Sequence, residues 1–227
     1  KKNPKADRFT TGLTYNLNFW GFNIYAEGAY QFGTAGDQKA DNNPKYIQAY
    51  TAAANLNYTV SAFTFGVGAD VISGTSREDL AKGDKTNTYD AGFQGKHSFY
   101  GLMNYFSSID KSTNNAGLND YYFKAEFKPK DSDFSCNLAV HGFITNQNFY
   151  MYAGTVNEKK ENFLGNELDF VAKYKIMKGA DLEWQTGLYM QSDAMKHIWD
   201  ADRTDEYDNF KRADMAYWTA LMIRVAL

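Results

Sequence analysis

Apolar and polar residues alternate with period two along most of this chain. Between residues 9 and 19 the odd positions carry Phe, Thr, Leu and Tyr, whereas the even positions carry only Thr, Gly and Asn. Successive side chains of a β-strand point to opposite faces of the sheet, so this pattern predicts a strand with one apolar and one polar face. Nine such strands are predicted, at residues 9–19, 22–32, 46–58, 63–71, 121–128, 134–141, 167–176, 181–191 and 213–227.

Strand length and aromatic placement decide between two kinds of antiparallel protein. A soluble β-sandwich or lipocalin-like barrel has the same period with its apolar face turned inward. Several predicted strands, however, are about 11 to 13 residues long, which is enough to cross a bilayer and long for a soluble sheet. Aromatic residues also fall near strand ends, as in the interfacial girdles of membrane barrels. Examples are Trp20, Phe32, Tyr46, Tyr58 and Tyr174.

These features predict an all-β fold, a transmembrane antiparallel up-and-down β-barrel, as a single domain over residues 1–227. Composition fits this prediction, because 17 Tyr, 17 Phe and 4 Trp accompany a mean hydropathy of only −0.57. Strands that alternate lipid-facing with water-facing residues produce such an average. No apolar run approaches the ~18 to 20 residues that a membrane-spanning helix needs. A net charge of −3 gives no sign of nucleic-acid binding.

The predicted connections alternate between short turns and long loops. Turns lie at Gly21, Val60, Pro129 and Gly179, and the loops are residues 33–44, 73–117, 145–163 and 192–212. Bacterial outer-membrane barrels have short periplasmic turns and long extracellular loops, which favours the outer membrane of a Gram-negative bacterium. An odd strand number, with the termini on opposite sides, does not make a complete single-chain bacterial barrel, because those barrels have even strand numbers and unpaired sheet edges are not tolerated in lipid. We therefore expect the chain to be the C-terminal portion of a longer barrel, or its edges to be closed by a partner or a second copy.

Four segments carry a resemblance to a known family. They are residues 26–33 (AEGAYQFG), 68–74 (GADVISG), 95–106 (GKHSFYGLMNYF) and 165–169 (GNELD). Together they resemble the alginate-export family of outer-membrane β-barrels, in order and over nearly the whole chain. The resemblance implies a porin-like monomeric barrel of about 18 strands, of which this chain is the C-terminal half. It also implies passage of a solute through the lumen, with long loops folding into the mouth.

Polar residues at inward positions are the candidate lining of the pore. Pores for polyanions need a basic lining, yet the inward charges of this chain are mixed. Each charge either forms a cross-strand ion pair that stiffens the barrel or lines a selectivity path, and both readings stay open. The candidate lining residues are Glu27, Gln31, Asp70, Lys124, Glu126, His141, Glu167, Asp169, Lys173, Glu183 and Arg224.

The longest loop contains an aromatic segment, residues 97–106. A connection of this length is usually functional or disordered, and the aromatic density favours order. One reading is a constriction or gate inserted into the lumen, and the other is an extracellular cap packed on neighbouring loops. The candidate constriction residues are His97, Phe99, Tyr100, Asn104 and Tyr105.

No motif for catalysis or cofactor binding accompanies these strands. His97, His141 and His197 share no zinc-site spacing. The acidic stretch at residues 200–208 lacks the spacing of a calcium loop and is better explained as a solvated loop. The lone Cys136 reads as a small apolar residue. We therefore expect no metal, no cofactor and no enzyme activity.

The sequence predicts an outer-membrane pore for passive passage of a hydrophilic solute, such as a saccharide or an anionic polysaccharide. Expected contacts are membrane lipid and lipopolysaccharide, the solute, and other outer-membrane proteins. The alternative is a structural or scaffold barrel within a larger outer-membrane assembly, with a plugged lumen. A barrel-embedded enzyme ranks third, because it would need an acid/base constellation that the chain does not show.

Overall fold

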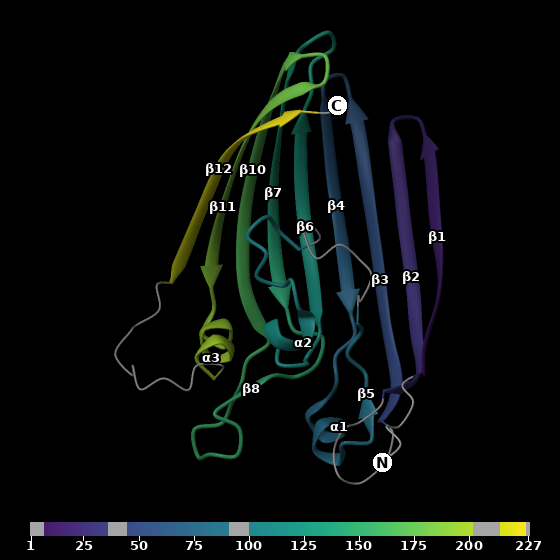
Figure 1. The fold of residues 1–227 in the computed structure, drawn as a ribbon, viewed down its shortest axis with the longest axis vertical. Coiled ribbons are helices and arrows are strands. Elements are labelled where there is room, and N and C mark those ends of the chain that lie inside the picture. Colours follow the sequence, from purple (N-terminus) through teal and green to yellow (C-terminus); the bar gives the residue numbers. More distant parts are fainter. Residues whose placement is uncertain (1–6, 36–44, 91–99, 202–213, 226–227) are drawn as a thin grey trace.

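The structure, a computed structural model, describes residues 7–35, 45–90, 100–201 and 214–225 (Figure 1). Nine long strands form one antiparallel sheet in which each strand pairs with the next long strand along the chain, so the predicted all-β, antiparallel class is confirmed. The strands are β1 (Asp7–Phe19), β2 (Phe22–Ala35), β3 (Lys45–Val60), β4 (Phe63–Ile72), β6 (Leu118–Phe127), β7 (Phe134–Ile144), β10 (Phe163–Met177), β11 (Ala180–Gln191) and β12 (Met215–Val225).

The long connections contain short elements that the period-two pattern did not predict. A tenth strand, β5 (Lys85–Thr86), pairs in parallel with β3. The others are the helices α1 (Arg77–Lys82), α2 (Ile109–Ser112) and α3 (Asp193–Ala201), and the hairpin of β8 (Tyr150–Met151) with β9 (Lys159–Lys160). All lie toward the lower end of the sheet in Figure 1. No helix in the described part of the chain is long and apolar enough to cross a membrane.

Tight turns close the opposite end of the sheet. The β1–β2 turn consists of Trp20 and Gly21, which both have positive φ, at 44° and 84°. Positive φ at both central residues matches the right-handed twist of a hairpin, and glycine adopts it most easily. A Cβ on Gly21 would also lie 2.8 Å from the Thr59 carbonyl oxygen. This turn therefore packs closely against the next strand.

The two faces of the sheet differ sharply. On the outer face Leu13, Leu221 and Ile223 are 78%, 69% and 68% exposed. The apolar rows are not covered by any described residue, which argues against the soluble sandwich, where such rows would pack together. The opposite face, here called the inner face, carries the buried carboxylates Asp120 and Glu167, each 0% exposed.

The inner face becomes apolar near the loop end. Ile47, Ile72, Leu118, Phe143 and Tyr189 are all buried there and belong to one hydrophobic cluster with residues of the long loops. Both faces are apolar at this level, so the alternation of apolar and polar residues is lost. The strands accordingly extend past the predicted ends, and β6 for example begins at Leu118 instead of at residue 121.

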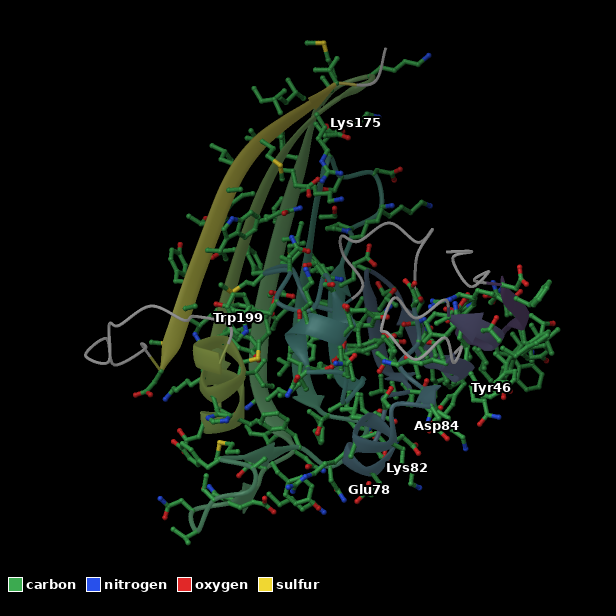
Figure 2. All side chains as sticks on the ribbon, turned by 60° about the horizontal axis from the view of Figure 1, so that its bottom comes forward. Tyr46, Glu78, Lys82, Asp84, Lys175 and Trp199 are labelled. Atoms are coloured by element: carbon green, nitrogen blue, oxygen red, sulfur yellow. The ribbon has the colours of Figure 1, made fainter. Side chains whose placement is uncertain are left out.

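The sheet is curved and open. Figure 2, turned so that the loop end comes forward, shows Trp199 of α3 and Tyr46 of β3 on opposite sides of the view, with the sheet bending between them. The outer edges of β1 and β12 are unpaired among the described residues. The described chain therefore forms a curved wall.

Two glycines, Gly68 on the inner face of β4 and Gly28 on the outer face of β2, provide a paired test of packing in the wall. A Cβ on Gly68 would overlap the ring of Tyr122 on β6, whereas a Cβ on Gly28 would meet only the Thr51 carbonyl oxygen, at 3.7 Å. Gly68→Ala should destabilise the protein by about 1–3 kcal/mol because Tyr122 must move. Gly28→Ala should be neutral or slightly stabilising, since alanine restricts the unfolded chain.

Urea unfolding of the full-length protein in detergent, followed by tryptophan fluorescence, measures both variants. Equal midpoints for the two variants would show that Tyr122 does not depend on the space above Gly68.

Candidate functional site: the polar inner face and the segment folded onto it

Three carboxylates stand at one level of the inner face. Glu27 on β2 is opposite Ala53 on β3, Ala53 is opposite Asp70 on β4, and Asp70 is opposite Asp120 on β6. Side chains of directly opposed residues share a face of the sheet. The register therefore aligns these carboxylates in a row across the strands.

His141 on β7 extends this row toward β10. Its Nδ1 lies 2.8 Å from Oδ2 of Asp120, and its Nε2 lies 3.8 Å from Oδ2 of Asp169. Glu167 is directly opposite His141 in the register of β7 and β10. We call Glu27, Asp70, Asp120, Glu167 and Asp169 the acidic belt. It crosses the inner face from β2 to β10.

Residues 100–117, here called the inserted segment, are anchored to the acidic belt through main-chain hydrogen bonds. The N–H of Leu102 donates to Oδ2 of Asp169 at 3.0 Å, and the N–H of Met103 donates to Oε1 of Glu167 at 2.8 Å. Gly101 has φ +76°, and a Cβ there would overlap the Glu167 carboxylate. Glycine therefore lets the backbone approach both acids closely.

Aromatic rings pack the inserted segment onto the wall. Tyr105 stacks on Tyr189 of β11 with ring centroids 4.2 Å apart, and Phe106 lies 4.5 Å from Phe143 of β7. Phe106 is buried in the hydrophobic cluster, together with Ile109 of α2. The segment thus lies against the inner face of the strands, in the foreground of β7 and β10 in Figure 1.

Tyr100 brings a hydroxyl close to the acidic belt. Burial raises the pKa of this hydroxyl well above its ordinary value, and the negative charges of Asp70, Asp120 and Glu27 raise it further. The ionised form is disfavoured both by desolvation and by like charge. Tyr100 is therefore a neutral hydroxyl beside carboxylates. Of the other candidate constriction residues, Asn104 is exposed, and His97 and Phe99 lie outside the described residues.

Nearer the turns, the charges of the inner face pair with one another. Glu183 on β11 is 2% exposed, and its Oε2 lies 3.4 Å from Lys173 Nζ and 3.0 Å from Arg224 Nε. Gln185 also donates to Glu183. The positive charges of Lys173 and Arg224 therefore offset the negative charge of Glu183. Lys124 makes a different contact, because its Nζ lies 6.0 Å from the centroid of the Tyr122 ring.

Two further predicted lining residues have different surroundings. Gln31 exchanges two hydrogen bonds with the backbone of Asp90, at 2.7 and 3.0 Å, and is buried. It therefore holds the loop that follows β5 and does not face open space. Glu126 is half-buried and stands opposite Thr64 and Asn137, near the turn end of β6.

A cluster of asparagines on β1, β2 and β3 did not stand out in the sequence. The Nδ2 of Asn23 donates to Asn16 at 2.7 Å and to Asn18 at 2.8 Å, and the Nδ2 of Asn57 donates to Asn23 at 3.1 Å and to Asn55 at 2.8 Å. We call these five residues the asparagine cluster. The sequence signal that could have revealed this cluster is asparagine at every second position of neighbouring predicted strands.

Asp120 is a further inner-face residue that did not stand out in the sequence. The predicted loop ends at residue 117 and the predicted strand begins at residue 121, so Asp120 belonged to neither. It is two residues from Tyr122, so both side chains lie on the inner face of the strand. Across the described chain, no group of three or more His, Cys, Asp or Glu side chains is arranged to hold a metal ion.

Comparison with known proteins identifies the family. A search of curated proteins gave no match. The family model described as Alginate export, in contrast, matches residues 1–208. This match covers most of the chain, including eight of the nine long strands, and it confirms the resemblance carried by the four sequence segments. The chain therefore belongs to the alginate export family.

Proposed function

We propose that this protein forms an outer-membrane pore through which a hydrophilic solute passes passively. The observation that carries the proposal is the two-faced curved sheet, with apolar rows exposed on its outer face and the acidic belt and asparagine cluster on its inner face. The alginate export family is an outer-membrane transport family. A polar inner face around water and an apolar outer face in lipid is the arrangement of a transmembrane barrel.

Aromatic rings beside the turns support this orientation. On the outer face Phe22 lies 4.5 Å from Tyr58, and Phe63 lies 4.9 Å from Phe127, between ring centroids. Membrane barrels place aromatic girdles at the level of the lipid headgroups. We propose that these rings contact lipid headgroups near the periplasmic surface and that the loop end faces lipopolysaccharide, in the outer membrane of a Gram-negative bacterium.

Closure of the wall is part of the proposal. The free edges of β1 and β12 present backbone N–H and C=O groups that hydrocarbon cannot satisfy, so an open sheet is unstable in a bilayer. We propose that further strands of a longer chain close the barrel, to about 18 strands in total. Closure by a second copy or another outer-membrane protein is the alternative.

The proposed pore works by width and charge. Passive passage involves no covalent chemistry on the solute, so the proposed function requires no catalytic residue. The inserted segment occupies the inner side of β7, β10 and β11, so it narrows the space that these strands enclose. We propose that it forms the constriction of the pore. A segment that filled the lumen completely would instead make the protein a scaffold barrel.

Electrical conductance separates these two functions. The full-length protein in a planar lipid bilayer should give steady, stepwise open-channel currents, because the inner face is polar from the acidic belt to the turns. Persistent silence, from protein that has folded and inserted, would contradict the pore and favour the plugged scaffold.

The orientation of the sheet is tested by a lysine at two adjacent positions of β7. Leu138 is exposed on the outer face, whereas Ala139 faces inward between Lys124 and Asp169. Leu138→Lys should cost about 2–4 kcal/mol because it buries a charge in lipid. Ala139→Lys should be tolerated much better, beside the Asp169 carboxylate. The folded fraction after insertion into vesicles, read from heat-dependent mobility in SDS gels, measures both. Reversed sensitivities would mean that the faces have been assigned the wrong way round.

A single substitution removes one of the hydrogen bonds that anchor the inserted segment. Glu167→Ala removes the acceptor for the Met103 N–H, and a hydrogen bond to a charged group contributes about 1.5–3 kcal/mol. The segment should then leave the wall more often, with about tenfold more time in a wider conducting state. Glu161→Ala is the control, because this half-buried carboxylate pairs with Lys159 and accepts from the Phe163 N–H outside the acidic belt. Single-channel records that match for the two variants would show that this anchor does not restrict the path.

A further inference from the structure

We propose that the pore selects neutral, hydroxyl-rich saccharides and excludes polyanions, and that the acidic belt and the asparagine cluster set this preference. The inference rests on the proposed pore function and specifies its solute. It departs from the anionic polysaccharide that the family's description names.

The acidic belt contains five carboxylates and few basic neighbours. Its five carboxylates face one another across a short stretch of the inner face, and His141 is the one basic group paired with them among the described residues. One imidazolium can balance one of these carboxylates, so each further carboxylate that ionises adds negative charge to the wall. A wall of one sign of charge concentrates its counter-ions and repels ions of its own sign.

Basic residues elsewhere on the inner face do not cancel this charge. Lys173 and Arg224 both pair with Glu183 near the turn end. Arg8 pairs with Asp90, at 2.6 Å, outside the belt. Lys124 lies on the inner face of β6, two residues from Tyr122, and its ammonium group approaches the ring of that tyrosine. A passing polyanion therefore meets Glu27 and Asp70, the two half-buried carboxylates of the belt, with little compensating charge.

Two oxygens of the belt are also short of hydrogen-bond donors. Oε2 of Glu167 and Oδ1 of Asp169 are buried and have no hydrogen-bond partner among the described residues. The inserted segment satisfies one oxygen of each carboxylate and leaves the other. Both side chains are buried beneath the inserted segment, so they add to the density of carboxylates in the wall without contacting a solute.

The asparagine cluster provides the complementary surface. Asn23 is four residues from Glu27 on β2, about 13 Å along the strand toward the turns. Amide side chains both donate and accept, as sugar hydroxyls do, and carry no charge. The Oδ1 of Asn57 is buried and has no partner among the described residues. A neutral oligosaccharide that passes the acidic belt therefore next meets a row of matching hydrogen-bonding groups.

The test is ion selectivity and sugar block of the full-length protein in a planar bilayer. Under a KCl gradient the reversal potential should show that potassium passes more readily than chloride. A neutral malto-oligosaccharide should interrupt the current, whereas an oligo-uronate of the same length should leave it unchanged. Steady current with chloride preference, or block by the oligo-uronate alone, would overturn the inference while leaving the pore intact. Absence of any current would overturn the pore itself and this inference with it.

Variants assign the preference to the two groups. The double variant Glu27→Gln/Asp70→Asn should lower the potassium-to-chloride permeability ratio roughly two- to tenfold, and Glu158→Gln, in the exposed loop of the β8–β9 hairpin, should not. Asn23→Ala should weaken block by the neutral sugar roughly fivefold, with Asn157→Ala as its exposed control. If the double variant does not fold, Glu27→Gln alone is measured. Unchanged selectivity in a folded variant would show that the belt does not set it.

Discussion

Backbone pairing along nine adjacent strands is the constraint on which the rest of this structure depends. Each long strand hydrogen-bonds to the next, so the strands hold one another in register and every second side chain falls on the same face. The apolar rows, the acidic belt and the asparagine cluster all result from that register. The same requirement leaves β1 and β12 with edges that only closure of the wall can satisfy in lipid.

The register also explains why charge gathers where it does. Asp70 and Asp120 come from strands separated by a long connection, yet they are directly opposed on the inner face. Carboxylates crowded in this way need hydrogen-bond donors, which His141, Leu102 and Met103 provide. The inserted segment is therefore held by the charges that it helps to cover. The proposed constriction and the proposed selectivity therefore both depend on the acidic belt.

Agreement between the sequence reading and the structure is closest where the information is local. The long strands, the short turns and the inward positions of Glu27, Asp70 and Glu167 could be predicted, because parity within a strand depends only on neighbouring residues. The elements within the loops were missed, since helices and strands this short leave no periodic pattern. Strand ends were misplaced where loops pack on the inner face and both faces become apolar, and Asp120 was lost for this reason.

The sequence by itself determined the class of fold, the two faces of each strand and the family, because alternation and short motifs are properties of consecutive residues. Only the tertiary structure decided which polar groups meet. Leu102 and Met103 find acceptors 67 and 64 residues away, and His141 reaches Asp120 across a strand pair. Such contacts depend on register and on how a long loop folds back, and neither is encoded in the period of the chain.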